Sequence, residues 1–279
     1  HILKASYYFA TNGFDLNYSS EFSNIIKTWN LGVKATFTSP NFAINYFGLG
    51  NNSLNPNANQ IQKKEYNRVR IKEMSAGTFI HWKGDLDAKI KIGVNIQNYQ
   101  IENTTGRFIS QELSPTNSVF EGQKFINTEA SYQFENTDND VFSTMGMKTE
   151  LKVGYTSNLK NDNNFAYLIP AISFNHKLFS SDKLILATKI KGHFNCGDSY
   201  EFYQAATIGG NDNGLRGYRN QRFTGKNSFY QSTDIRLLLS KIKTSFVPLN
   251  IGVYGGFDYG KVWGEQNLTI NPFSSKRWK

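Results

Sequence analysis

Cysteine is almost missing from this chain of 279 residues, because Cys196 is the only one. A single thiol excludes a disulfide framework, so the fold must hold without cross-links. His193 lies three residues before Cys196, but the remaining histidines are scattered and no second ligand pair completes a zinc site. We therefore expect no metal site in this chain.

Motifs for catalysis and cofactor binding are also missing. Gly209, Gly210 and Gly214 do not match a phosphate-binding loop. Asp212 and Asn213 lack the rest of a calcium-binding EF-hand loop. Serine, histidine and aspartate occur, but no nucleophile motif does. We therefore expect no catalytic residues and no cofactor, and we do not expect this chain to be an enzyme.

Long hydrophobic runs are absent as well. No stretch approaches 18 consecutive apolar residues, so no transmembrane helix is expected. Hydrophobic residues make up only 39% of the chain and the mean hydropathy is −0.49, yet aromatic residues reach 15%. A membrane-spanning β-barrel explains this pair of values, because one face of each strand meets lipid, the other meets water, and aromatic residues gather at the interfaces. A soluble all-β lectin or adhesin fits the composition equally well.

Apolar and polar residues alternate with a period of two, which indicates β-strands. In one segment the apolar residues Ala88, Ile90, Ile92, Val94 and Ile96 interleave with Lys89, Lys91, Asn95 and Gln97. Many alternating segments reach ten or more residues, whereas strands of soluble proteins average about five or six. A strand that crosses a membrane needs about 9–11 residues, and a wet lumen permits the repeated charges on the polar face.

The alternation predicts strands at 2–11, 13–23, 28–39, 41–49, 66–83, 86–102, 125–136, 145–158, 164–179, 183–196, 228–244 and 249–263. Asn12-Gly13, Gly84-Asp85 and Ser181-Asp182 are predicted to be short turns. Longer polar stretches lie at 50–64, 103–124 and 197–227. Short turns that alternate with long loops are typical of outer-membrane barrels.

The formal net charge is +9, but the lysines are spread along the alternating strands. Because they form no single basic run, a nucleic-acid partner is not indicated. In a barrel, positive charge fits either the lumen or the rim that faces anionic lipid phosphates. Trp29, Trp82, Trp263 and Trp278 fit interfacial anchors, although core packing or strand ends would explain them equally.

Three sequence patterns towards the C-terminal end are the most specific part of the chain. Residues 209–219 contain Arg216-Gly217-Tyr218 within a glycine-rich stretch. They are followed by Ser232-Thr233-Asp234-Ile235-Arg236 and then by Gly256-Phe257-Asp258-Tyr259-Gly260-Lys261-Val262-Trp263. In this order and spacing, the patterns resemble the loop-six, strand-twelve and strand-thirteen motifs of the Omp85 (surface antigen D15) family of BamA/TamA-like outer-membrane barrels.

A narrower resemblance lies upstream. Phe47-Gly48-Leu49-Gly50-Asn51 is followed by Tyr66-Asn67-Arg68-Val69-Arg70. These segments are similar to Omp85 barrels that carry an N-terminal patatin-like or metallophosphoesterase domain. The resemblance covers about twenty residues and implies a passenger domain outside this chain.

The family resemblance implies an all-β fold, a transmembrane antiparallel β-barrel with sixteen strands in full and about twelve in this chain. We expect one partial barrel domain over residues 1–279, with loop six at about 197–227. The family places loop six between strands eleven and twelve, and ten predicted strands precede residue 197. The chain would then supply strands two to thirteen, with the first strand, the last three strands, the seam between first and last strands and any periplasmic domains outside it.

The resemblance also implies that loop six folds back into the lumen, with Arg216, Gly217 and Tyr218 as a latch. A guanidinium withdrawn from bulk water needs partners, and Asp234 and Asp258 are the candidates. The family usually has glutamate at the position of Asp234, whose side chain is one methylene shorter. We therefore expect Asp258 to be the principal partner and the contact with Asp234 to be water-bridged or lost.

Strand alternation supports this geometry. On one strand Ile235, Leu237 and Leu239 would face lipid, and on the other Val253, Phe257 and Tyr259 would do so. Asp234 and Asp258 would then both point inward, as alternation requires. Gly256 and Gly260 would leave space for a close approach beside Asp258.

The function that the resemblance implies is insertion or translocation of polypeptides at the outer membrane of a Gram-negative bacterium, without nucleotide hydrolysis. The expected partners are outer-membrane lipid and lipopolysaccharide, unfolded outer-membrane or secreted client proteins, and periplasmic or lipoprotein accessory subunits. Two alternatives stay open: a passive outer-membrane channel, and a membrane anchor or exporter for an N-terminal hydrolase domain. The patterns do not name the client, the direction of transport or the oligomeric state.

Overall fold

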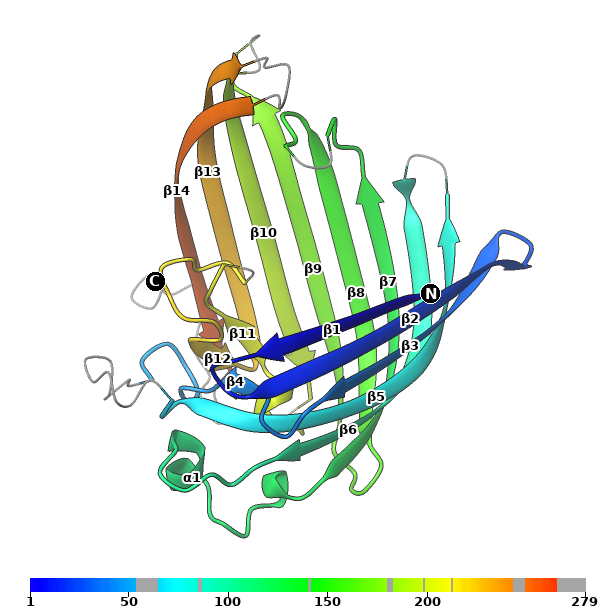
Figure 1. The fold of residues 1–279 in the computed structure, drawn as a ribbon, viewed down its shortest axis with the longest axis vertical. Helices are drawn as coiled ribbons and strands as arrows, with labels where there is room; N and C mark the ends of the chain where they lie inside the picture. Colours follow the sequence, from blue (N-terminus) through cyan, green and yellow to red (C-terminus); the bar gives the residue numbers. More distant parts are fainter. Residues whose placement is uncertain are drawn as a thin grey trace.

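The computed structural model describes residues 1–53, 65–84, 87–139, 142–179, 183–197, 199–211, 213–242 and 249–264. Strands dominate these residues (Figure 1). They are β1 (Ile2–Tyr8), β2 (Gly13–Ile26), β3 (Trp29–Thr38), β4 (Ala43–Asn45), β5 (Arg68–Lys83), β6 (Lys89–Ile101), β7 (Gln123–Glu135), β8 (Gly146–Asn158), β9 (Asn164–Lys177), β10 (Leu184–Cys196), β11 (Ala206–Ile208), β12 (Phe223–Gly225), β13 (Asn227–Ile242) and β14 (Leu249–Trp263). One short helix, α1 (Phe108–Glu112), and two 3-10 turns, Ser118–Phe120 and Phe202–Gln204, accompany them. Within these described ranges, no helix has the length and apolar character needed to cross a membrane.

The strands form one 12-stranded antiparallel sheet, which confirms the all-β prediction and the expected strand number. Its order is β1-β2-β3-β5-β6-β7-β8-β9-β10-β13-β14, with β4 paired to the start of β5. The sheet curls strongly, and β1 and β14 are its two edges (Figure 1). Among the described residues these edges do not pair, so the barrel is not closed in this chain.

The prediction of a strand over 41–49 is wrong, because only the three residues of β4 join the sheet there. Gly48 and Gly50 have φ values of 87° and 91°, and this left-handed backbone cannot continue a strand. Phe47, the apolar residue beside them, is buried at the loop end of the sheet instead of facing outward. The ten strands of the sheet that precede loop six among the described residues therefore include this short one, and the other nine have seven residues or more.

The two faces of the sheet differ as the alternation predicts. Exposed apolar side chains line one face, including those of Ile92, Val94, Ile96, Leu151, Val153, Ile235, Leu237 and Phe257. Aromatic residues mark both ends of this face. Trp29 lies directly opposite Trp82 at the short-turn end, and Phe194 packs edge-on against Trp263 at the other, with ring centroids 6.0 Å apart. This is the arrangement expected of interfacial girdles on a lipid-facing surface. Trp278 lies outside the described residues.

The long connections share one end of the sheet. The β3–β5, β6–β7 and β10–β13 connections all lie there, whereas the two-residue turn between β2 and β3 lies at the other end (Figure 1). The β1–β2 hairpin turns over residues 9–12, because Tyr8 pairs with Gly13, so Gly13 of the predicted Asn12-Gly13 turn already belongs to β2; Asn12 has the φ of 50° typical of a turn. Asp85, Ser181 and Asp182 of the other predicted turns are outside the described residues.

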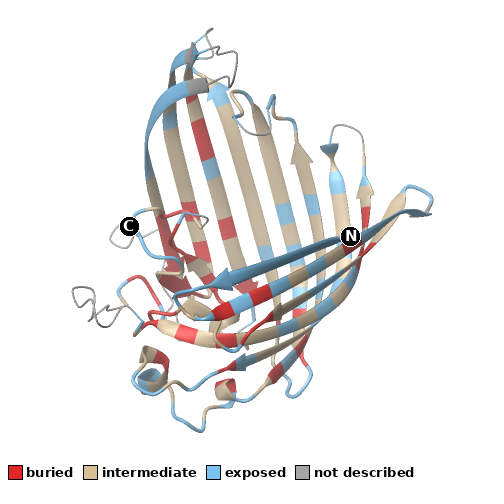
Figure 2. Ribbon diagram, in the orientation of Figure 1, coloured by how far each residue is buried: buried red, intermediate tan, exposed pale blue. Residues whose placement is uncertain are grey.

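Buried residues gather mainly at the end with the long connections (Figure 2). One cluster joins the β3–β5 and β6–β7 connections and consists of Tyr46, Val69, Ile71, Ile101, Ile109 and Val119. Phe202 and Tyr203 of loop six pack against it. The long loops thus form a packed cap, which gives loop six a fixed surface on which to rest.

Candidate functional site at the contact of loop six with the barrel wall

Loop six connects β10 to β13 and folds into a compact unit. Its two short strands, β11 and β12, pair antiparallel with each other. Between them Gly209, Gly210 and Gly214 have φ values of 124°, 91° and 94°, which side chains rarely adopt. The Gly210 amide donates to the Leu215 carbonyl at 2.9 Å, so the chain reverses tightly just before Arg216.

An apolar cluster fixes this reversal on the sheet. It consists of Ile208, Leu215, Phe223, Tyr230 and Val262, each at most 3% exposed. Three of these residues come from loop six and two from β13 and β14, which we call the barrel wall. Since Leu215 immediately precedes Arg216, burial of the leucine side chain fixes the position of the Arg216 backbone.

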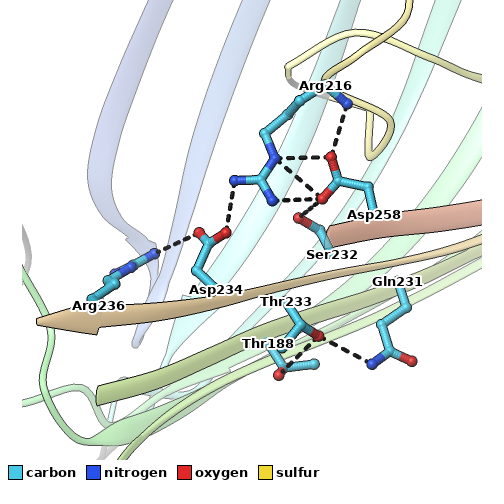
Figure 3. Close-up of polar contacts among 8 residues, drawn as sticks. All are labelled: Thr188, Arg216, Gln231, Ser232, Thr233, Asp234, Arg236 and Asp258. Atoms are coloured by element: carbon cyan, nitrogen blue, oxygen red, sulfur yellow. Dashed lines mark hydrogen bonds and ion pairs between the residues drawn. The ribbon is translucent and has the colours of Figure 1, made fainter. Parts of the chain in front are cut away.

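Arg216 makes its closest contacts with Asp258 of β14 (Figure 3). Its Nε lies 2.8 Å from Asp258 Oδ2 and its Nη2 lies 2.6 Å from Oδ1. The Arg216 backbone amide also donates to Oδ2, at 2.9 Å. One carboxylate therefore holds both the fork of the guanidinium and the main chain of the loop, which lysine could not reproduce.

The second carboxylate, Asp234 of β13, takes the free end of the same guanidinium. Arg216 Nη1 lies 2.7 Å from Asp234 Oδ1, and Arg236 Nη2 lies 3.7 Å from Oδ2 (Figure 3). The expectation that this contact is water-bridged or lost is therefore corrected. The shorter side chain suffices because the backbones of β13 and β14 approach closely here, with Asp234 directly opposite Gly256.

Gly256 makes this approach possible. A Cβ atom at this position would lie 2.2 Å from Asp234 Oδ1 and 3.1 Å from Arg216 Nη2. Gly260 of β14 has the same effect beside loop six, where a Cβ would lie 3.1 Å from the Ile208 side chain. Both glycines therefore leave the space that the sequence pattern predicts.

The charges of the site are balanced, with two arginines and two aspartates. The side chains of Asp258 and Asp234 are 10% and 15% exposed, and that of Arg216 is 31% exposed. Hydrogen bonding to Asp258 raises the pKa of Arg216 above its ordinary value, against the opposing effect of desolvation. Partly desolvated charges of this kind are stable only when they are paired.

Gly217 and Tyr218 are placed differently from Arg216. Gly217 is exposed, with no atom within 4 Å of the position that a Cβ would take. Tyr218 is 43% exposed, and its ring packs against Phe223 of the same loop, with centroids 5.0 Å apart. The structure thus brings Arg216, Asp234 and Asp258 together, whereas the other two residues of the predicted latch stay on the loop.

Ser232 and Leu215 complete the site, and neither was assigned from the sequence. The Ser232 hydroxyl donates to Asp258 Oδ1 at 2.6 Å and thereby orients the carboxylate. Alternation on β13 carried a signal for it, because Ser232 has the same parity as Asp234. Leu215 had no such signal, since a single leucine in a glycine-rich loop does not indicate burial.

The arrangement is suited to holding a loop against the barrel wall. The site pairs two guanidinium groups with two carboxylates and one hydroxyl, and Asp212 of the weak calcium pattern lies outside the described residues. Within the described ranges, no group of three or more His, Cys, Asp or Glu residues could hold a metal ion.

Known proteins resemble this chain in domain and in fold. The Omp85 superfamily domain matches residues 5–278. No curated protein matches the chain at a significant level. BamA from Haemophilus ducreyi lacking POTRA domains 1-3 is similar, with a TM-score of 0.65 and 15% identity over 90% of this chain and 50% of that one. CdiB from Acinetobacter baumannii has a TM-score of 0.58 and 11% identity over 99% and 44%.

The chain spans about half of the length of these two structures. Their low identity makes them evidence for the fold alone, and the fold agrees with the curled 12-stranded sheet. The domain match covers nearly every residue and includes all three patterns found in the sequence. This chain therefore belongs to the Omp85 superfamily of outer-membrane β-barrel proteins.

Proposed function

We propose that this protein inserts or translocates polypeptides at the outer membrane without hydrolysing nucleotides. The observation that carries the proposal is the loop-six latch, in which Arg216 is held by Asp258 and Asp234 on the inner face of β13 and β14. The latch therefore fixes loop six to the inner face of the barrel wall, at the end of the sheet where the long connections lie. Gly217 and Tyr218 lie exposed on the same loop, next to Arg216.

The driving force would be the folding of the client itself. An unpaired strand edge is costly in a bilayer, because no water satisfies its backbone groups. A barrel that offers a strand edge to an unfolded client therefore lowers the kinetic barrier to insertion. No cofactor is needed, and the chain acts as a non-enzymatic catalyst of folding.

The setting of this activity follows from the proposal. Residues 1–279 form one partial barrel domain in the outer membrane of a Gram-negative bacterium. Its partners are outer-membrane lipid and lipopolysaccharide, unfolded outer-membrane or secreted clients, and accessory periplasmic or lipoprotein subunits. BamA and CdiB, two of the structures similar to this chain, support the fold and leave the client open.

A passive channel is the weaker alternative, because a pore does not need a loop clamped by matched charges. A membrane anchor for an N-terminal hydrolase draws on one specific observation, the Phe47–Asn51 and Tyr66–Arg70 segments and their narrower resemblance. In that case any hydrolase activity belongs to a domain outside this chain.

The experiment that tests the proposal uses the complete protein in liposomes. A urea-unfolded outer-membrane client is added to the liposomes. Its folding rate is measured from the growth over time of the band that the folded client gives on a gel. We expect the native barrel to accelerate folding well above an inert porin at equal protein-to-lipid ratio. Arg216→Ala should weaken the acceleration, because both aspartates then lose their shared cation.

The outcomes separate the candidates. Equal rates with the native barrel and with the porin would rule out general insertion and favour a channel or a dedicated passenger. Full acceleration by Arg216→Ala would retain insertion and remove the latch from the mechanism.

A further inference from the structure

Residues 43–53, which we call the clamp segment, contact loop six and the barrel wall from a distant part of the chain. The segment includes β4 and the Phe47–Asn51 pattern, to which the latch assigns no role. Leu49 and Gly50 form β-bridges with Thr224 of β12, and the Gly50 amide donates to the Thr224 carbonyl at 2.7 Å. The β3–β5 connection thus pairs directly with loop six.

Asn51 joins the clamp segment to β14. Its Nδ2 donates to the Val262 carbonyl at 2.7 Å, and its Oδ1 accepts from the Val262 amide at 3.0 Å. Both backbone groups of one residue point to the same side of an antiparallel strand, so this side is the one away from β13. The buried Asn51 amide therefore occupies a backbone position at which another strand would otherwise pair.

Arg222 of loop six inserts into the clamp segment from the other direction. Its Nη1 donates to the Ser53 hydroxyl at 2.7 Å and its Nη2 to the Ser53 carbonyl at 2.6 Å. Its guanidinium carbon lies 4.9 Å from the ring centroid of Phe47 and 4.7 Å from that of Phe223. Burial lowers the pKa of Arg222, and two aromatic faces with two acceptors offset that desolvation.

A third contact lies near the start of the same segment. The Asn45 amide donates to Gln221 Oε1 at 2.9 Å, and Asn45 Nδ2 donates to the Asn220 carbonyl at 3.1 Å. These bonds flank Arg222 on its N-terminal side. The clamp segment therefore contacts loop six at Asn220, Gln221, Arg222 and Thr224, away from the Arg216 site.

We propose that the clamp segment is a second anchor of loop six, in which Asn51 and Arg222 are positioning residues that act independently of Arg216. Arg216 holds the tip of the loop to the inner face of the wall, and the clamp holds its returning strand and the end of β14. The placement rests on the contacts alone, whereas its importance for clients rests on the proposed function. Loop six leaves its site only when both anchors are released.

The test is hydrogen–deuterium exchange of the complete protein in liposomes. Asn51→Ala removes both bonds to Val262, and we expect exchange of the Val262 amide to become about tenfold faster, as for the loss of a buried hydrogen-bond pair. Peptides covering residues 206–225 should exchange faster too, while peptides from β7 to β9 stay unchanged. Asn52→Ala is the matched control, because Asn52 is exposed and adjacent.

Independence is tested with Arg216→Ala. This change should accelerate exchange at the backbone amide of position 216, which in the native protein donates to Asp258, and leave the Val262 amide protected. The double variant with Asn51→Ala should release residues 206–225 more than either single change. Equal exchange in Asn51→Ala and Asn52→Ala would overturn the second anchor, and so would loss of Val262 protection in Arg216→Ala.

A second variant keeps the proposal testable if Asn51→Ala does not fold. Arg222→Lys retains the charge but cannot stack between two rings while donating twice to Ser53. It should speed exchange over residues 206–225, and unchanged exchange there would refute the anchor. Altered exchange with normal client folding would count against the proposed function alone, because exchange reports loop position whatever the barrel does.

Discussion

At the scale of single residues, the site depends on the planar fork of one guanidinium. Arg216 contacts Asp258 through two nitrogens and Asp234 through the third, so one side chain joins loop six to two strands. Hydrogen bonds to charged groups each contribute roughly 1.5–3 kcal/mol when their partners are desolvated. Geometry and charge therefore act together in this contact.

Arg216→Lys separates these two contributions. Lysine keeps the positive charge but presents a single point donor, so we expect it to recover little of the loop stability lost in Arg216→Ala. Asp258→Asn should be more damaging than Asp234→Asn, because Asp258 also accepts from the loop backbone and from Ser232. Protease cleavage rates within loop six of the complete protein measure this order. Full recovery by lysine would mean that charge alone holds the loop.

Gly256→Ala tests the close approach of the two strands. The added methyl would lie within 2.2 Å of Asp234 Oδ1, so we expect a loss of about 1–3 kcal/mol from overpacking. Gly255→Ala is the control, because nothing lies within 4 Å of its Cβ position. The midpoint of urea unfolding in liposomes compares them. Equal midpoints would show that β13 and β14 separate without cost.

The family resemblance pointed to Arg216 as the loop residue that folds back, and alternation supported Asp234 and Asp258 as its partners. The parity of β13 and β14 placed Asp234 and Asp258 on the inner face, and both lie there. The directness of the Asp234 contact was not predictable, because it depends on a strand separation that Gly256 permits. The contact of Asn51 with Val262 was equally hidden, since no local pattern links two residues 211 positions apart.

At the scale of elements, loop six is a small folded unit with its own buried cluster. Alternation predicted the long strands well, because each has one outward apolar face. It failed at 41–49, where a short apolar run that includes Phe42, Ile44 and Phe47 meets the left-handed Gly48 and Gly50. A short apolar run that packs beneath loops cannot be told from a strand by its period alone.

Leu215→Ala should loosen this unit. Leu215 is 1% exposed between the glycine reversal and Arg216, and truncation of buried leucines costs about 2–5 kcal/mol. We expect faster deuterium uptake over residues 206–225 and a weaker Arg216 contact, although no charge has changed. Uptake at the native rate would mean that the charged pair alone positions the loop.

At the scale of the whole molecule, the sheet separates two environments. The outward face carries the exposed apolar side chains and the aromatic residues at both ends, and the inner face carries the charges and loop six. This separation explains how a chain of low mean hydropathy can span a bilayer.

Substitution by arginine on the two faces should therefore give different results. Val153→Arg near the middle of β8 places a charge on the outward face and should cost about 2–4 kcal/mol in lipid. Gln133→Arg on the inner face lies between Glu150 of β8 and Lys89 of β6, where water and the carboxylate are within reach, and should cost less than Val153→Arg. Urea midpoints in liposomes compare the two variants. Similar midpoints would contradict the assignment of the outward face to lipid.

The hydrogen bonds between Asn51 and Val262 also bear on the order in which the protein folds. The residues are 211 positions apart, and every strand from β5 to β13 lies between them in sequence. Contacts that close such a large loop form late, because the entropy of the intervening chain must be lost first. Protection of the Val262 amide from exchange would therefore appear only after the intervening strands have paired. The time at which this single amide becomes protected would then report when the sheet is complete.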